Sequence, residues 1–248
     1  MFAGNIRSMT PQSRFPTILI TRPEPQASRF AKDLIATFGP TVSTLVSPLM
    51  RPEVLVPALP QMPFASVVFT SESGVRAARE LKLTLPDMAF CVGDQTAKVA
   101  AQAGFTALSA KGDADDLFDL LMIHADFQPF LLLQGKETRG NLLERLRARG
   151  VNAAQAVIYE QREQPLNAAA VNALTNKGDV ILPVFSPRTA ELLVAAMGHI
   201  NVVAKTRFVA ISPACAKKLG PFAELASVSA TPDRGGMMDA LKAVVSCT

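Results

Sequence analysis

Short apolar runs alternate along the chain with polar loops and with segments that have the spacing of an amphipathic helix. Each apolar run predicts a buried strand, and each following segment, with apolar residues three or four apart, predicts a helix. Three such units lie in the middle of the chain, at 67–80, 90–105 and 131–150. Strands that alternate with helices in this way predict parallel sheets covered by helices, which is the α/β class.

The units in the middle of the chain have similar counterparts elsewhere. In chain order, the pairs are 67–80 with 183–196, 90–105 with 208–220, and 109–121 with 229–241. In the last pair both segments begin with Ser-Ala, and the spacing to the following Asp and Leu residues is identical. The unit at 131–150 has its counterpart at the other end of the chain, at 18–39. Both carry a basic loop residue, Lys136 or Arg22, and both end in Gly, a usual helix stop.

This displaced unit predicts two similar parallel-sheet α/β domains, one of them discontinuous. The predicted domains are residues 1–47 with 162–248, and residues 48–161 as the inserted domain. The chain then crosses between them at 44–50 and 156–162, two short apolar runs that we expect to pair as a two-stranded β-ladder. The only tyrosine of the chain, Tyr159, lies in the second crossing and therefore in the predicted hinge.

Length and composition agree with two domains. The 248 residues are 49% hydrophobic and 19% charged, enough for sizeable cores. No apolar run approaches the roughly 18–20 residues that span a membrane, and residues 1–15 have no apolar core typical of a signal peptide. We therefore expect a cytoplasmic protein without membrane contact, and we interpret residues 1–15 as an extension, with Met9 as an alternative start.

The charge is mildly basic, with a formal net charge of +4. This balance is typical of an ordinary solvated surface and is also compatible with an anionic partner. The absence of a Lys/Arg run interleaved with aromatic residues argues against a nucleic-acid partner. The cysteines are odd in number and widely spaced, and the two histidines are isolated, so we expect neither a disulfide framework nor a metal site.

The loops after the predicted strands share small, hydroxyl-bearing and, in several cases, basic residues. They lie at 21–25, 70–74, 93–97, 134–140, 186–190 and 212–216. Backbone N–H groups and the helix dipole favour anions at such positions. Ordinary helix capping explains any one of these loops, but six of them on two matched domains favour a cleft for a polyanionic ligand.

Conventional catalytic and nucleotide-binding motifs are absent from the sequence. None of the loops has the spacing of a P-loop or a dinucleotide fingerprint, and no Ser-His-Asp set is evident. Cys215 lies at a predicted helix N-terminus, where thiol pKa values fall, although a small capping residue is the simpler interpretation. The pattern suits an intrinsically reactive substrate that the protein holds in one geometry.

The succession of these segments resembles the uroporphyrinogen-III synthase family. The segments that carry the resemblance are ILITRPEPQASRFAKDL, VVFTSESGVRAA, CVGDQTAKVAAQAGF, LLLQGKETRGNLLERLRARG, VIYEQREQP, VFSPRTAE, FVAISPACAKKL and SATPDRGGMMDAL. They preserve the family order from about residue 16 onward. The resemblance implies two α/β domains joined by a two-stranded β-ladder, with the active site in the cleft between them.

The same resemblance implies a lyase of tetrapyrrole (haem) biosynthesis that uses no cofactor or metal. Its substrate is hydroxymethylbilane, a linear tetrapyrrole with eight carboxylates. Loss of the hydroxyl as water gives an azafulvene cation, and a spiro intermediate inverts the last pyrrole ring as the macrocycle closes to uroporphyrinogen III. We expect a monomer, with transient contact to the deaminase that makes the substrate.

The resemblance also implies roles for individual residues. Tyr159 matches the family's hinge tyrosine, whose phenol would assist departure of the hydroxyl; the alternative is a strand tyrosine that only packs. The expected substrate-binding residues are Arg22, Thr70, Ser71, Ser73, Gly93, Thr96, Gly135, Lys136, Ser186, Ser212 and Cys215. The chain has Ala214 and Cys215 where many family members carry hydroxyl residues, so only backbone contacts are carried over there.

Two other interpretations stay open from the sequence. One is a non-catalytic two-domain binding module for an anionic small ligand, which would not need Tyr159. The other is a regulatory or scaffolding relative with a degenerate site, which the departure at Ala214 and Cys215 would fit.

Overall fold

The structure is a computed structural model that describes residues 15–137 and 140–247. The chain forms two compact units. The first unit contains the chain up to Arg51 together with the chain from Glu163 onward, and the second unit is Pro52–Arg162. The chain therefore passes between the units twice, after Arg51 and after Arg162.

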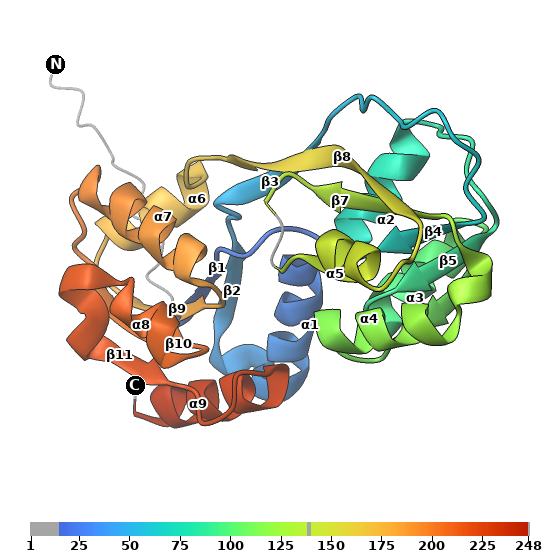
Figure 1. Cartoon of the computed structure of the whole chain (residues 1–248). Helices are drawn as coiled ribbons and strands as arrows, with labels where there is room; N and C mark the ends of the chain where they lie inside the picture. The colour runs from blue at the N-terminus through green and yellow to red at the C-terminus, as the bar shows by residue number, and fades with distance from the viewer. Residues whose placement is uncertain (1–14, 138–139, 248) are drawn as a thin grey trace, which may run out of the picture. The chain divides into compact units, whose positions relative to one another are not determined.

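The first unit is built on a five-stranded sheet with the order β11-β10-β9-β1-β2 (Figure 1). Its strands are β1 (Thr17–Ile20), β2 (Ser43–Val46), β9 (Asp179–Val184), β10 (Lys205–Ala210) and β11 (Ala226–Val228). All four neighbouring pairs are parallel. Parallel strands need long crossover connections, and helices supply them here.

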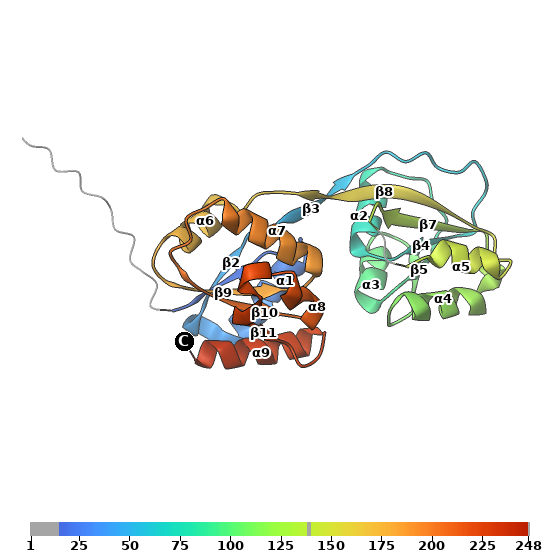
Figure 2. The ribbon, with the colours of Figure 1, turned by 60° about the vertical axis from the view of Figure 1, so that its left-hand side comes forward.

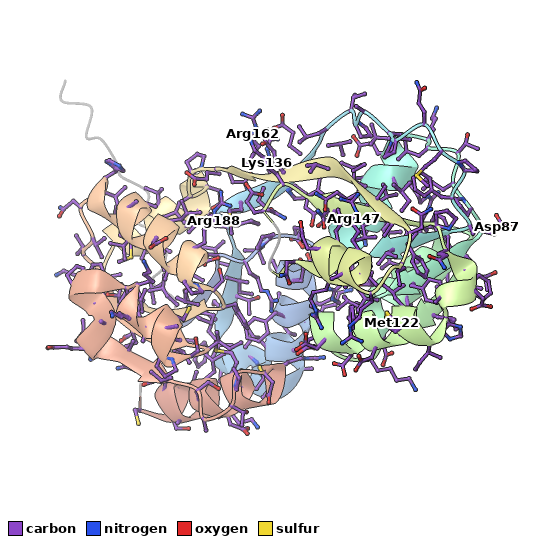
Figure 3. All side chains as sticks on the ribbon, viewed as in Figure 1. Asp87, Met122, Lys136, Arg147, Arg162 and Arg188 are labelled. Atoms are coloured by element: carbon purple, nitrogen blue, oxygen red, sulfur yellow. The ribbon has the colours of Figure 1, made fainter. Side chains whose placement is uncertain are left out.

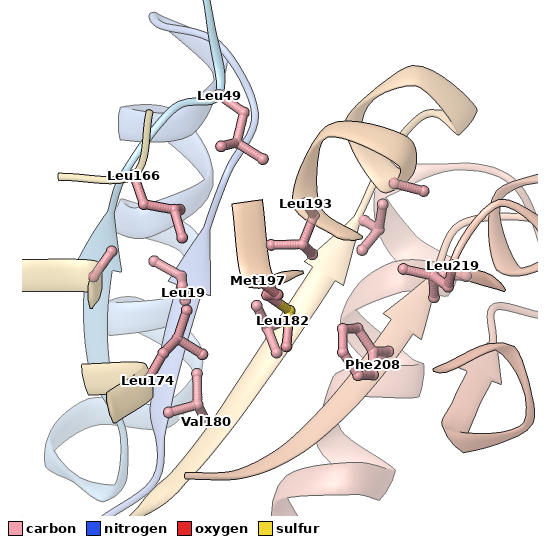
Figure 4. Close-up of a cluster of buried hydrophobic side chains, with 14 of the residues drawn as sticks. Leu19, Leu49, Leu166, Leu174, Val180, Leu182, Leu193, Met197, Phe208 and Leu219 are labelled. Atoms are coloured by element: carbon pink, nitrogen blue, oxygen red, sulfur yellow. The ribbon is translucent and has the colours of Figure 1, made fainter. Parts of the chain in front are cut away.

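Helices cover both faces of this sheet. The helices are α1 (Gln26–Phe38), α6 (Ala168–Thr175), α7 (Pro187–Gly198), α8 (Pro213–Lys217) and α9 (Arg234–Ser246), with short 3₁₀ turns at Gly39–Thr41 and Gly220–Leu225. On one face Leu19 packs with residues of α6, α7 and α8 (Figure 4). On the other face Ile18 and Ile20 pack with residues of α1 and α9. Burial on both faces explains why β1 is a continuous apolar run rather than an alternating one.

The second unit is built on a six-stranded sheet with the order β3-β8-β7-β4-β5-β6. Its strands are β3 (Met50–Val54), β4 (Ser66–Phe69), β5 (Met88–Cys91), β6 (Thr106–Ser109), β7 (Phe130–Gly135) and β8 (Ala153–Glu163). The pairs from β8 to β6 are parallel. The N–H of Leu55 donates to Ile158 and the N–H of Gln164 donates to Leu49, so β3 and β8 run in opposite directions.

Helices also cover both faces of the second sheet (Figure 2). The helices are α2 (Glu72–Glu80), α3 (Asp94–Gln102), α4 (Ala114–Ile123) and α5 (Leu142–Ala148), with a 3₁₀ turn at Ala125–Phe127. Val67 and Phe69 of β4 pack with residues of α2 and α3 on one face. Val68, between them, packs with residues of α4 and α5 on the other face.

The two sheets have the same order once the displaced unit is taken into account. The order β6-β5-β4-β7-β8 in the second unit corresponds to β11-β10-β9-β1-β2 in the first, and β7 takes the place of β1. This is the repeat predicted from the sequence, and the predicted fold class of two similar parallel-sheet α/β domains is confirmed.

One local feature differs from the prediction. The segment 44–46 belongs to β2 of the first sheet, and the strand that pairs with β8 begins only at Met50. Residues 47–49 form an irregular connection between the two strands, so the apolar run at 44–50 is not one strand. An apolar pattern does not show where such a run is interrupted or which neighbour each half pairs with. In the part of the chain that the structure describes, no helix combines the length and the hydropathy needed to cross a membrane.

Candidate active site

Tyr159 lies at a bulge in β8. Gln134 of β7 is paired with Val157, but the next residue, Gly135, is paired with Tyr159, so Ile158 is the extra residue. A bulge of this kind turns the following side chain relative to the strand, and bulges recur near active sites. Here the bulge brings the tyrosine ring over the end of β7.

Gly135 makes room for the tyrosine ring. A Cβ atom at Gly135 would lie 2.7 Å from Cζ and 2.8 Å from Cε2 of Tyr159, closer than van der Waals contact allows. The N–H of Lys136 donates to the Tyr159 carbonyl at 2.9 Å, which fixes the backbones of the two strands together at this point. The ring is therefore held directly against the main chain of β7.

Ser71 fixes the tyrosine hydroxyl. The hydroxyl oxygens of Ser71 and Tyr159 are 2.8 Å apart, and either group can donate. Ser71 is also the N-cap of α2, because its side chain accepts the N–H of Gly74 at 3.2 Å. One hydroxyl therefore joins the start of α2 to the phenol on β8.

The environment keeps this phenol protonated. The residue is only 8% exposed, and burial raises the pKa of Tyr159 above its ordinary value. The hydrogen bond between Ser71 and Tyr159 acts in the opposite direction on this pKa, and the negative charge of Glu137 raises it further. At neutral pH the hydroxyl is thus a proton-bearing group, which can donate to an oxygen of a ligand.

The phenol faces a pocket of about 430 Å³ that lies within the second unit. Its described lining residues are Thr70, Ser71, Val92, Ala114, Gln134, Gly135, Glu137, Gly140, Leu142, Leu143, Glu144, Gln155 and Tyr159. The polar groups are hydroxyls, amides and two carboxylates, and the rest is apolar or backbone. The amide of Gln134 donates to Gln155 at 2.8 Å, so the two amides hold one another. Such a pocket can orient a heteroaromatic ring beside a hydroxyl donor.

Four of the sequence-predicted residues come together at this pocket: Thr70, Ser71, Gly135 and Tyr159. Three others in the same unit do not line it. Ser73 and Thr96 are buried near the starts of α2 and α3, and Gly93 is the N-cap of α3. Of these three positions only Gly93 is an N-cap, whereas Ser73 and Thr96 lie inside the first turns of their helices.

Lys136 makes an ion pair beside the pocket. Its Nζ lies 3.1 Å from Glu160, which also accepts from Arg162 at 2.9 Å; Figure 3 shows Lys136 and Arg162 close together beside β8. The hydrogen bond from Lys136, with the charge of Arg162, lowers the pKa of Glu160 below its usual value. The Lys136 side chain is 64% exposed, so a stronger anion can compete for it at low cost.

Arg22 and Ser186 belong to the first unit. The guanidinium carbon of Arg22 lies 4.1 Å from the centroid of the Phe185 ring, a cation–π contact, and Phe30 meets the same ring edge-on. Burial lowers the pKa of Arg22, but the group stays charged at physiological pH. Ser186 is the N-cap of α7 and accepts the N–H of Thr189 at 3.1 Å.

Ser212 and Cys215 are engaged with each other. Ser212 caps α8 by accepting the N–H of Cys215. The Cys215 thiol is fully buried and donates to the carbonyl of Val184 at 3.4 Å. Burial raises the pKa of the Cys215 thiol to about 11, so the helix N-terminus does not produce a reactive thiolate here. The packing and capping interpretation of Cys215 is the one that its surroundings support.

The site residues expected from the sequence did not include the amides and carboxylates of the pocket, namely Gln134, Gln155, Glu137 and Glu144. Gln134 and Glu137 do lie in the loop 134–140, which was expected to bind an anion. The sequence does contain a signal for Gln155. From Ala153 to Tyr159 it is the only strongly polar residue in an apolar run. Within residues 15–137 and 140–247, no three His, Cys, Asp or Glu side chains converge as metal ligands would.

Comparison with known proteins agrees with this architecture. A family model described as Uroporphyrinogen-III synthase HemD matches residues 32–239. The chain belongs to the uroporphyrinogen-III synthase family. The match confirms the resemblance drawn from the sequence and, with it, the predicted function: closure of hydroxymethylbilane to uroporphyrinogen III in haem biosynthesis.

A solved structure of this family supports the fold. The crystal structure of uroporphyrinogen-III synthetase from Helicobacter pylori 26695 has a TM-score of 0.61 to this chain at 20% sequence identity. The similarity covers 93% of this chain and 100% of the other. A comparison with curated proteins gives no match.

The raised pKa of Tyr159 can be measured directly, since the chain has one tyrosine and no tryptophan. We expect the near-ultraviolet absorbance of tyrosinate to titrate at higher pH in the folded protein than in guanidinium, where the value is near 10. Because the unfolded chain loses this proton first, the contribution of Tyr159 to stability is complete below about pH 10 and falls as pH rises through the folded value. Equal titration midpoints in the two states would contradict the burial described here.

Replacement of Gly135 tests the contact with the ring. Gly135→Ala forces the Tyr159 ring or the end of β7 to move, and we expect a loss of about 1–3 kcal/mol in the free energy of unfolding. Gly198→Ala is the matched control, because a Cβ atom there meets nothing within 4 Å. Urea unfolding of both variants measures the difference. Wild-type stability in Gly135→Ala would show that the ring is not packed on this glycine.

Proposed function

We propose that Tyr159 is the residue that assists loss of the hydroxyl when this chain converts hydroxymethylbilane to uroporphyrinogen III. The observation that carries this proposal is the arrangement of the phenol, which is buried, protonated and hydrogen-bonded to Ser71 at the wall of a pocket. A protonated phenol at such a wall is placed to act on an oxygen of a bound ligand.

In the proposed step, the carbon–oxygen bond of the hydroxymethyl group breaks and its electron pair goes to oxygen. The proton of Tyr159 passes to that oxygen, and water leaves. The adjacent pyrrole nitrogen stabilises the cation that remains. The pyrrole ring at the far end of the substrate attacks this cation, and the spiro intermediate rearranges. The proton released when the rings regain aromaticity returns to the phenolate of Tyr159. The sum is one substrate converted to one macrocycle and one water.

The substrate carboxylates need separate binding groups. We propose Arg22, Lys136 and the loops that contain Ser186 and Ser212 for this role. Within the described residues Arg22 makes no ion pair, and its guanidinium is held by Phe185, so its donors are available to a carboxylate. The hydroxyls of Ser186 and Ser212 accept capping hydrogen bonds. These loops would therefore bind a carboxylate mainly through backbone N–H groups at the helix starts.

The finer assignments follow from this reaction. The enzyme would be a hydro-lyase that needs no cofactor, because the reactive group belongs to the substrate. We propose that it works as a cytoplasmic monomer in transient contact with the deaminase that makes hydroxymethylbilane. Direct transfer would limit the spontaneous closure of this substrate without ring inversion.

We also propose that β3 and β8 act as a hinge between the predicted domains.

Isomer analysis tests the proposed activity. Hydroxymethylbilane is generated in place by its deaminase, the protein is added, and the oxidised type I and type III uroporphyrins are separated. We expect type III in an amount that depends on this protein. Type I alone, from protein with a folded circular-dichroism spectrum, would contradict the activity and favour the non-catalytic binding module.

A further inference from the structure

Among the residues that the structure describes, the charged groups that line the Tyr159 pocket are carboxylates. Glu137 and Glu144 lie at its wall, and none of its described lining residues is Lys or Arg. The proposed substrate carries eight carboxylates, which two glutamates repel. The part of the substrate that enters this pocket is therefore expected to be the uncharged or positively charged part.

From this we infer that Glu137 is the counter-charge of the cation that forms when the substrate hydroxyl leaves. The inference rests on the proposed function. Two residues of the pocket then have separate roles. Tyr159 acts on the departing oxygen, and Glu137 stabilises the positively charged ring system that remains. Glu137 forms and breaks no covalent bond in this step.

Hydrogen bonds hold Glu137 beside the strand of the tyrosine. Its Oε2 atom accepts the backbone N–H of Gln161 at 3.3 Å. Gln161 lies two residues after Tyr159 in β8, and the preceding residue of the loop, Lys136, donates its N–H to Tyr159. The start of the loop after β7 thus lies along β8, and the exposed carboxylate of Glu137 is hydrogen-bonded to this strand two residues beyond Tyr159.

The charge of Glu137 affects the phenol and the substrate in opposite directions. It raises the pKa of Tyr159, which makes the phenol a weaker acid. It also favours a positive charge in the pocket. The second effect is expected to dominate, because the hydrogen bond with Ser71 partly offsets the first. Among the described residues of this wall, Glu144 is the only other carboxylate that a cation would meet. Glu137 itself is exposed, so its effect grows when the substrate displaces water from the pocket.

The variant Glu137→Gln tests the inference, since it removes the charge and keeps an oxygen that can accept from Gln161. The first readout is the tyrosinate absorbance titration, which reports Tyr159 alone. We expect its midpoint to move to lower pH than in the wild type. The second readout is type III formation, for which we expect kcat to fall by about tenfold or more with a small change in KM.

Two further variants make the result specific. Glu80→Gln removes the same charge from an exposed position at the end of α2, outside the pocket, and should leave both readouts unchanged. Glu137→Asp keeps the charge and should retain most of kcat. An unchanged tyrosine titration in Glu137→Gln, or a wild-type kcat in that variant, would overturn the inference. The titration needs no turnover, so a wild-type protein that makes no type III product would instead contradict the proposed function.

Discussion

The contact of the Tyr159 ring with Gly135, together with the hydrogen bond between its hydroxyl and that of Ser71, determines the geometry of the candidate site. The first contact needs a glycine at the end of β7, because any Cβ atom would overlap the ring. The second needs a helix that starts with a serine at the end of β4. The bulge in β8 brings the tyrosine to both. Three parallel strands and one helix start are thus joined through one side chain, which limits the positions that the phenol can adopt.

The chemistry of the pocket follows from this placement. Burial keeps the phenol neutral, and the amides of Gln134 and Gln155 bond to each other. None of the described lining residues is Lys or Arg. Two of the basic side chains proposed for carboxylate binding have other contacts: Lys136 is paired with Glu160, and Arg22 rests on Phe185. This division suits a substrate with a reactive, weakly polar ring at one end and many carboxylates around it. In the proposed reaction, different residues therefore bind the carboxylates and assist loss of the hydroxyl.

Sequence reasoning predicted the fold because each βα unit carries its own apolar and capping signals. The displaced unit at 18–39 was enough to predict a discontinuous domain, and the strand orders of the two sheets agree with it. Tyr159, Ser71 and Gly135 were chosen through the family resemblance; they line one pocket, and their roles toward a substrate stay predictions. The bulge at Ile158 and the carboxylate of Glu137 at the pocket wall were not, because both depend on the register between β7 and β8. Likewise, the sequence alone does not distinguish a loop serine that caps a helix from one that binds a ligand. Ser186 and Ser212 are examples, because both accept capping hydrogen bonds.

The most direct test of the central claim is the rate at which Tyr159→Phe forms type III product from freshly generated hydroxymethylbilane. Phenylalanine keeps the ring on Gly135 and removes only the hydroxyl. The account predicts a fall of about 100-fold in turnover, at the lower end of what a positioned proton donor supplies, with substrate binding preserved. Type III formation at the wild-type rate would show that the phenol takes no part in loss of the hydroxyl.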